Sequence, residues 1–198
     1  MRILVVGASG LIGRHVVAAL RPQHEVIEAS RSRSAVAVDI SSPPSIRSML
    51  EAVGNVDALI CAAGAARFAP WDKLTDEDYE FTLRNKLMGQ VNLVRLGAPR
   101  VRDRGAITLT SGILANRPIP GSAVVSLVNA GVEGFARAAA IEIGRGVRVN
   151  VVSPGWIAET KKALGMEVSG ALTAAEVAKF YVASLDGGET GQVIVADR

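Results

Sequence analysis

The sequence predicts an α/β protein: a three-layer, doubly wound parallel sheet of about seven strands, with helices on both faces. Short apolar runs alternate along the chain with longer segments whose apolar residues recur at helical spacing. Of the 198 residues, 49% are hydrophobic and only 4% are aromatic, so Val, Ile, Leu and Ala must build the core, as they do in parallel sheets. No repeat, low-complexity segment or linker divides the chain, so residues 1–198 are expected to form one domain.

The first element is a strand at residues 2–6, where four consecutive apolar residues stop abruptly at Gly7. Gly7, Gly10 and Gly13 follow at intervals of three, and helical spacing resumes at residues 15–20. This geometry can hold a diphosphate: Gly7 permits the tight turn, Gly10 lets backbone N–H groups approach the phosphates, and Gly13 lets helix and strand pack closely. The alternative is a turn that binds nothing. We expect a dinucleotide site, lined also by the residues between the glycines: Ser9, Leu11 and Ile12.

The next elements follow from apolar runs and capping residues. Residues 25–29 and 35–38 are expected to form the second and third strands. A helix begins at the Ser-Pro-Pro of residues 42–44, because proline is tolerated in the first turn, and ends near residue 53. Residues 56–62 form the fourth expected strand. Thr75, followed by three acidic residues, is a strong helix start, and this helix should extend to about residue 97.

The second half of the chain continues the alternation. Strands are expected at residues 105–110, 147–152 and 192–196, and helices at 122–143 and 174–185. Parallel strands joined by right-handed crossovers place all their carboxyl ends at one edge of the sheet. Ligands bind beyond that edge, where the strand order reverses. Functional residues are therefore expected just after strands one, two, four, five and six.

The tip of the second strand indicates which cofactor binds. A site for NAD usually places an acid here, where it accepts a hydrogen bond from the ribose 2′-OH. This chain offers Ser30, Arg31, Ser32 and Arg33, and arginines favour a 2′-phosphate through charge-assisted hydrogen bonds. We therefore expect NADP(H) to be preferred over NAD(H). Two alternatives stay open: Glu28 takes the acid position if the strand ends two residues earlier, or the arginines are solvated loop residues.

Composition argues against several other classes of function. The net charge is only +3 and no Lys/Arg block is interleaved with aromatic residues, so nucleic acid is not expected as a partner. Cys61 is the only cysteine, and no cluster of His, Cys or carboxylates has metal-ligand spacing. Polar residues interrupt the apolar stretch at 122–143, which predicts a packed helix and no membrane span. Because the first strand starts at residue 2, no leader is expected, and the expected compartment is the cytosol.

In these motifs, and over nearly its whole length, the chain resembles the short-chain dehydrogenase/reductase family of nicotinamide-dependent oxidoreductases with a Rossmann fold. The resemblance implies further cofactor-binding residues, which fall in three segments: Asp39 and Ile40 at the adenine, Ala62, Ala63 and Gly64 beside the ribose, and Pro154, Gly155, Trp156 and Ile157 at the nicotinamide. It also implies an active centre. Ser111, preceded by Thr110, matches the serine that polarises the substrate carbonyl, and Asn85 matches the helix asparagine of the proton relay.

The chain departs from the family at the proton donor. The family begins its long helix with Tyr-x-x-x-Lys, but counting back from the matching segment 130–135 places Val125 at the tyrosine position and Asn129 at the lysine position. Valine cannot transfer a proton, and asparagine carries no charge. The two tyrosines, Tyr79 and Tyr181, are expected to be packing or surface residues. A positioned general acid contributes roughly 10²–10⁴-fold to a rate, or about 3–5 kcal/mol, so a slower reduction remains physically possible.

The leading hypothesis is an NADP(H)-dependent oxidoreductase that acts on a small carbonyl or alcohol, with Ser111 polarising the carbonyl and a water held by Asn85 and Asn129 supplying the proton. The main alternative is a catalytically inactive NADP(H)-binding module that reports redox state to a partner. A less favoured one is a cofactor-assisted isomerase or lyase. The helix at 122–143 is apolar nearly all round, and family members commonly associate through it, so a homodimer or homotetramer is expected.

Overall fold

The computed structural model of the protein describes residues 1–198 and confirms the predicted fold class. All seven strands pair in parallel, in the order β3-β2-β1-β4-β5-β6-β7. The order reverses between β1 and β4, so the loops that follow these two strands diverge and leave space between them. The strands are β1 Arg2–Val6, β2 Glu25–Ser30, β3 Val36–Ala37, β4 Val56–Cys61, β5 Val101–Thr110, β6 Arg148–Pro154 and β7 Val193–Ala196.

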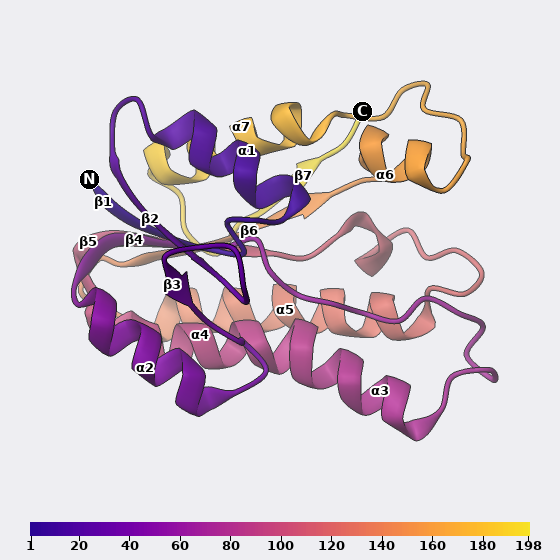
Figure 1. Ribbon diagram of the computed structural model, residues 1–198, viewed down its shortest axis with the longest axis horizontal. Coiled ribbons are helices and arrows are strands. Elements are labelled where there is room, and N and C mark those ends of the chain that lie inside the picture. Colours follow the sequence, from indigo (N-terminus) through magenta and orange to yellow (C-terminus); the bar gives the residue numbers. More distant parts are fainter.

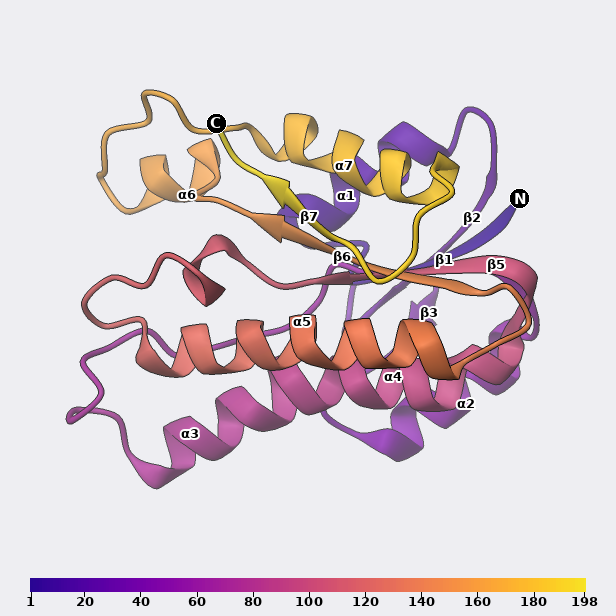
Figure 2. The same ribbon diagram turned by 180° about the vertical axis from the view of Figure 1, so that it is seen from behind.

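Helices cover both faces of the sheet (Figure 1). On one face lie α1 (Leu11–Leu20) and α7 (Ala174–Asp186), and on the other lie α2 (Pro43–Val53), α4 (Gly89–Gly97) and α5 (Ala123–Glu142). Figure 2 shows the same layers from behind, with α5 running along the sheet. The other helical segments are α3 (Asp76–Thr82), the π-helix η1 (Leu83–Met88), α6 (Ala158–Ala163), and the 3₁₀ turns η2 (Ala98–Arg100) and η3 (Ile113–Ala115).

The core has two layers, one on each face of the sheet. Successive strand residues point to opposite faces, so Leu59 of β4 joins the layer of 24 buried residues facing α2, α4 and α5, whereas Ile60 joins the layer of 18 facing α1 and α7. Strands buried on both sides read as continuous apolar runs, which explains why they could be predicted from the sequence.

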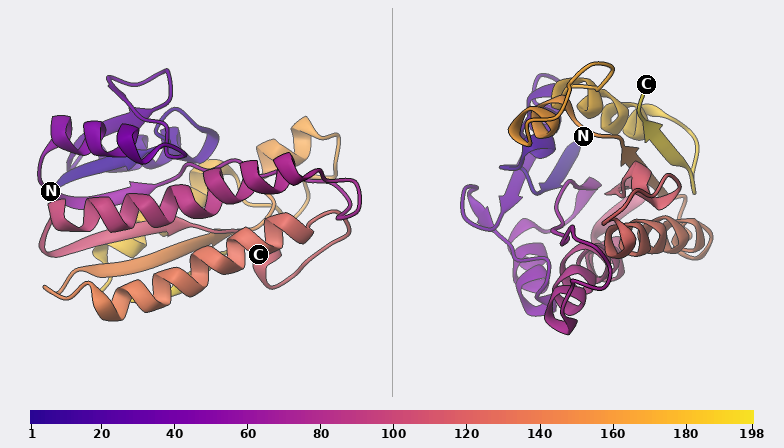
Figure 3. Two further views of the ribbon diagram at one scale, coloured as in Figure 1. Left: turned by 90° about the horizontal axis from the view of Figure 1, so that it is seen from below. Right: turned by 90° about the vertical axis from the view of Figure 1, so that its right-hand side faces the viewer.

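Element boundaries differ from the prediction where charge or backbone geometry intervenes. β5 begins at Val101 and not at residue 105. Its first residues are polar and therefore do not have the apolar pattern of a buried strand. The guanidinium of Arg102, for example, pairs with Asp57 at 2.7 Å instead of entering the core. The helix expected from residue 75 to residue 97 contains the π-helix η1, so that α3, η1 and α4 form one continuous rod beside α5 (Figure 3). The short helix α6 was not predicted.

Helix α5 buries one face and leaves another open. Val124, Val128 and Val132 are buried, whereas Leu127 is 51% exposed and Ile141 is 85% exposed. By length and composition α5 is the one helix apolar enough to cross a membrane, and 39% of its most apolar stretch is buried in this fold. The single chain therefore covers only one side of this helix and leaves apolar side chains on its other side exposed.

Candidate cofactor and active site

The turn between β1 and α1 has a backbone conformation that requires glycine. Gly7 has a φ of +87°, and a Cβ atom on it would lie 2.7 Å from the carbonyl carbon of Ala62. A Cβ on Gly13 would lie 2.0 Å from the carbonyl oxygen of Gly7, so α1 can approach β1 this closely only with glycine there. Gly10 caps α1 without a side chain, and the first helical turn contains no acidic residue. The N–H groups and positive dipole end of α1 are thus left for an anion.

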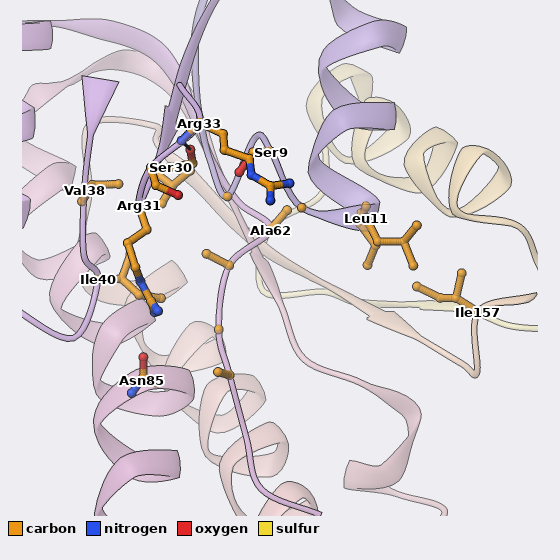
Figure 4. A pocket seen from close by; sticks show the side chains of 18 of the residues that line it. Ser9, Leu11, Ser30, Arg31, Arg33, Val38, Ile40, Ala62, Asn85 and Ile157 are labelled. Atoms are coloured by element: carbon orange, nitrogen blue, oxygen red, sulfur yellow. Dashed lines mark hydrogen bonds between the residues drawn. The ribbon is translucent and has the colours of Figure 1, made fainter. Parts of the chain in front are cut away.

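A cleft of about 630 Å³ opens beside this turn, at the reversal of strand order. Figure 4 shows residues from the tips of β1, β2 and β4 surrounding it, with Ile157 at the far end. Most of the residues expected to bind the cofactor line this cleft: Gly7, Ser9, Gly10, Leu11, Ile12, Ser30, Arg31, Ser32, Arg33, Ile40, Ala62, Ala63, Gly64 and Ile157. Val6, Val38, Ala65 and Thr160 also line it and were not predicted.

Two exposed arginines reach into one end of the cleft. Arg31 extends over Ile40 toward Asn85, and Arg33 extends toward Ser9 (Figure 4). Neither guanidinium takes part in an ion pair, and the backbone N–H of Arg33 donates to the Ser30 hydroxyl oxygen at 3.1 Å. β2 extends to Ser30, so no carboxylate stands at its tip.

The carboxylate of Glu28 points elsewhere, because it pairs with Arg21 at the end of α1. It does not line the cleft. The alternative in which Glu28 acts as the ribose-binding acid therefore finds no support in this geometry.

Several residues expected at the cofactor lie behind or beside the cleft. The carboxylate of Asp39 accepts hydrogen bonds from the backbone N–H and the hydroxyl of Ser41, at 2.9 and 2.7 Å. The Ser41 hydroxyl is the main reason that the pKa of Asp39 lies below its usual value. The Thr110 hydroxyl donates to the Cys61 carbonyl at 2.5 Å and lies 2.6 Å from the Tyr181 hydroxyl, on the side of the sheet that α7 covers.

The segment after β6 is held by the neighbouring chain end. Gly155 donates its N–H to the Ala196 carbonyl at 3.0 Å and, with Pro154, does not line the cleft. Trp156 packs edge-on against Phe68, with ring centroids 6.2 Å apart. Of these residues only Ile157 reaches the cleft wall.

No hydrogen bond joins the three residues expected to form the active centre. Ser111 is buried, and its hydroxyl donates to the Glu133 carboxylate at 2.8 Å. Asn85 lines the cleft near Arg31, and its amide donates to the Phe81 carbonyl at 3.1 Å. The side chain of Asn129 lies against Gly112, the residue after Ser111. A Cβ atom on Gly112 would lie 2.9 Å from the Asn129 Nδ2. The Asn129 Oδ1 is buried without a hydrogen-bond partner.

Two charged residues at this centre were missed by sequence reasoning. Glu133 is 4% exposed, and besides Ser111 it accepts hydrogen bonds from Ser153 at 3.3 Å and Asn116 at 3.4 Å. A carboxylate in the middle of an apolar helix, one turn beyond Asn129, was the signal that could have identified it. Lys86 of η1 donates from its Nζ to the Ser111 carbonyl at 3.3 Å. No sequence signal identifies Lys86, because its orientation toward the end of β5 depends on the π-helix η1 and on how α3, η1 and α4 pack in the fold.

Arg117, in the loop after β5, pairs with Asp197 at 3.1 Å. This ion pair is on the surface and joins the loop after β5 to the chain end that follows β7.

Comparison with known proteins agrees with this geometry. The profile of a family described as enoyl-(acyl carrier protein) reductase matches residues 13–197. Hydroxynaphthalene reductase arp2 of Aspergillus fumigatus is 30% identical over 142 residues, which are 67% of this chain and 52% of that protein. A hydroxynaphthalene reductase-like protein Arp2 of Metarhizium guizhouense is 30% identical over 161 residues, which are 76% of this chain and 60% of that protein. The chain thus spans about half the length of the reductases it matches.

Solved structures resemble the fold over its full extent. The protein lin1944 of Listeria innocua is 42% identical, with a TM-score of 0.94 and coverage of 98% of both chains. A small-chain dehydrogenase in complex with NADPH is 26% identical, with a TM-score of 0.88 and coverage of 100% of this chain and 96% of that one. Together with the glycine turn and the cleft, these matches show that the chain belongs to the short-chain dehydrogenase/reductase family.

Proposed function

We propose that this protein is an NADP(H)-dependent oxidoreductase that reduces a carbonyl compound or oxidises the corresponding alcohol. The observation that carries the proposal is the cleft, in which a glycine cradle for a diphosphate adjoins two unpaired arginines at the tip of β2. The residues fit the cofactor: the α1 N-terminus would hold the diphosphate, and Ile157 and Thr160 line the far end of the cleft. When bound, the cofactor supplies or accepts a hydride.

The arginines support a preference for NADP(H). A 2′-phosphate at this position gains charge-assisted hydrogen bonds from Arg31 or Arg33, each worth about 1.5–3 kcal/mol. NAD(H) would leave the arginines without an anion. The relative crystallised with NADPH is consistent with the same choice in this chain.

Titration of NADPH and NADH by nucleotide fluorescence tests this preference. The Arg33→Ala variant should bind NADPH about 10- to 100-fold more weakly, while its NADH affinity changes less than about 3-fold. Arg47→Ala on α2 is the matched control, because Arg47 is equally exposed, forms no ion pair and does not line the cleft. Tighter binding of NADH than of NADPH by the wild-type protein would refute the assignment.

The chain's own contribution to the chemistry centres on Ser111 and Glu133. Because the Ser111 hydroxyl donates to Glu133, its lone pairs are free to accept a hydrogen bond from the hydroxyl of an alcohol. In the reductive direction Ser111 must turn its O–H toward the carbonyl oxygen. The names of the hydroxynaphthalene reductases support an aromatic or cyclic ketone as substrate.

The decisive assay is NADPH oxidation in the presence of benzaldehyde, cyclohexanone, β-tetralone and phenanthrenequinone. Turnover of at least one carbonyl is expected, with a rate that Ser111→Ala lowers by about 10²-fold or more. Steady NADPH absorbance over the whole panel would contradict the proposed activity.

One observation favours a second candidate function, an inactive NADP(H)-binding module that reports redox state. By the resemblance to the family, Val125 and Asn129 stand at the positions of the usual proton donor and its lysine, and Glu133 already accepts the hydrogen bond of the Ser111 hydroxyl. This candidate predicts tight NADPH binding without turnover, and different conformations with the oxidised and reduced nucleotides. Hydrogen exchange of the α5 and α6 segments in both complexes would detect the difference.

We also propose that the protein associates with a second copy through α5. Leu127 and Ile141 on that helix are exposed, and a groove of about 490 Å³ runs between α4 and α5 beside Phe135. Size-exclusion chromatography with light scattering should give a dimer or tetramer. A monomeric mass would contradict this proposal without affecting the others.

A further inference from the structure

The π-helix η1 aims a lysine at the carboxyl ends of two central strands. Two residues beyond it, Gln90 holds the rod in place: its side chain accepts from the Thr110 N–H at 2.9 Å and donates to the Thr110 carbonyl at 2.8 Å. This pairing fixes the rod against the end of β5, and the wide turns of a π-helix then direct Lys86 inward. Its Nζ lies 3.3 Å from the Ser111 carbonyl oxygen.

The stem of Lys86 passes behind Gly64, a residue of the cleft wall. Gly64 lines the cleft with a φ of +144°, and a Cβ on it would lie 2.7 Å from the Cδ of Lys86. Only glycine at this position gives the lysine side chain room to pass from η1 to Ser111. The ammonium is thus placed between the cleft wall and the serine expected to meet the substrate.

No anion neutralises this ammonium. Lys86 takes part in none of the eight ion pairs, and the Ser111 carbonyl is its one hydrogen-bond partner, which leaves two N–H groups for a ligand. The titratable groups around it are Cys61 at the end of β4, whose pKa burial raises to about 11, and Glu133 on α5, which Ser111 engages. Desolvation lowers the pKa of Lys86 to about 8. The group can therefore both hold and release a proton near neutral pH.

We propose that Lys86 supplies the charge missing at Asn129 and is the proton donor to the substrate oxygen, at the point where its side chain joins Gly64 of the cleft wall to Ser111. This inference rests on the proposed reductase activity. In reduction, the carbonyl carbon gains a hydride and the C=O π bond breaks. The oxygen then takes a proton from the Lys86 ammonium, an N–H bond breaks as the O–H bond forms, and water reprotonates the neutral amine. In oxidation the same amine accepts the alcohol proton.

Competitive acetylation with acetic anhydride tests the site without any turnover. The reactivity of each of the five lysines is followed against pH by mass spectrometry, with the exposed Lys73 and Lys179 as internal standards. Lys86 should titrate with a pKa of about 8, and NADP⁺ should protect it at least several-fold while leaving the two standards unchanged. An ordinary lysine pKa of about 10.4 with no protection would overturn the proposal.

The kinetic arm uses phenanthrenequinone and NADPH with the wild-type protein, Lys86→Met, Lys86→Arg and the control Lys179→Met on α7. The wild-type kcat should fall above about pH 8. Lys86→Met should abolish this decrease of kcat at high pH and lower kcat by about 10²–10⁴-fold, while the NADPH Kd changes less than 10-fold. Lys86→Arg should shift the decrease of kcat to higher pH, because a guanidinium group keeps its proton. Thermal unfolding of each variant reports whether it is folded.

The possible failures separate cleanly. An active wild type with a Lys86→Met variant of equal kcat and equal pH profile overturns the role of Lys86 and leaves the proposed activity standing. A wild type that binds NADPH and reduces none of the carbonyls overturns the proposed activity, and with it the proton transfer. A protected Lys86 would then be only a nucleotide-binding cation.

Discussion

Replacement of Gly13 by alanine tests whether the close contact between β1 and α1 builds the cofactor site. The new Cβ would lie 2.0 Å from the Gly7 carbonyl oxygen, which must retreat by about 1.4 Å to reach ordinary contact at 3.4 Å. Overpacking of this kind costs about 2–3 kcal/mol, and the better helix propensity of alanine offsets about 1 kcal/mol of it. The net destabilisation should therefore be about 1–2 kcal/mol.

For a domain of this size that loss lowers the melting temperature by roughly 2–8 °C. The effect on the nucleotide should be larger than the effect on the fold, because the displaced Gly7 carbonyl belongs to the turn proposed to hold the diphosphate. NADPH affinity should fall more than about 10-fold, a loss of about 1.4 kcal/mol of binding free energy.

Urea unfolding and NADPH fluorescence titration measure the two effects on the same preparation. Gly188→Ala is the matched control, since its Cβ would meet nothing within 4 Å and its φ is not positive. If Gly13→Ala binds NADPH as tightly as the wild-type protein and unfolds within about 0.5 kcal/mol of it, the cradle has been assigned to the wrong residues.

Three further predictions concern the buried polar groups. Glu133→Ala should destabilise the fold by about 2–4 kcal/mol, because it leaves the Ser111 hydroxyl unpaired and opens a cavity. Glu133→Gln should destabilise it less. Equal urea unfolding midpoints for the two variants would contradict this prediction. Tyr181→Phe should cost about 1–2 kcal/mol in urea unfolding by removing the buried hydrogen bond to Thr110, and an unchanged midpoint would show that this bond is not formed. The pKa of Lys86 is depressed from 10.5 to about 8 in the fold, so its contribution to stability is present at high pH and is lost as pH falls through about 8. Lys86→Met should therefore have a larger free energy of unfolding than the wild-type protein at pH 7. After allowance for the partial exposure of the lysine side chain, this difference should shrink by about 1–2 kcal/mol between pH 7 and pH 10. A difference that stays constant with pH would indicate a lysine of ordinary pKa.

The sequence determined the alternation of strands and helices, because strands buried on both faces must be apolar throughout and helices must bury one stripe. It also located the glycine turn, because the contact between Gly13 and Gly7 acts between neighbours along the chain, whereas the contact between Gly7 and Ala62 arises only in the packed sheet. The tip of β2 followed from the end of an apolar run at Ser30.

The arrangement around Ser111 was decided only by the tertiary structure. Whether its hydroxyl meets Asn129 or Glu133 depends on how α5 is rotated against β5 and β6, and no local pattern encodes that rotation. Lys86 reaches Ser111 because of a π-helix, a pairing of Gln90 with the β5 backbone and the missing side chain of Gly64. The last two join segments distant in sequence, and the charged side chain between these segments gains its low pKa from burial that only the packed fold provides.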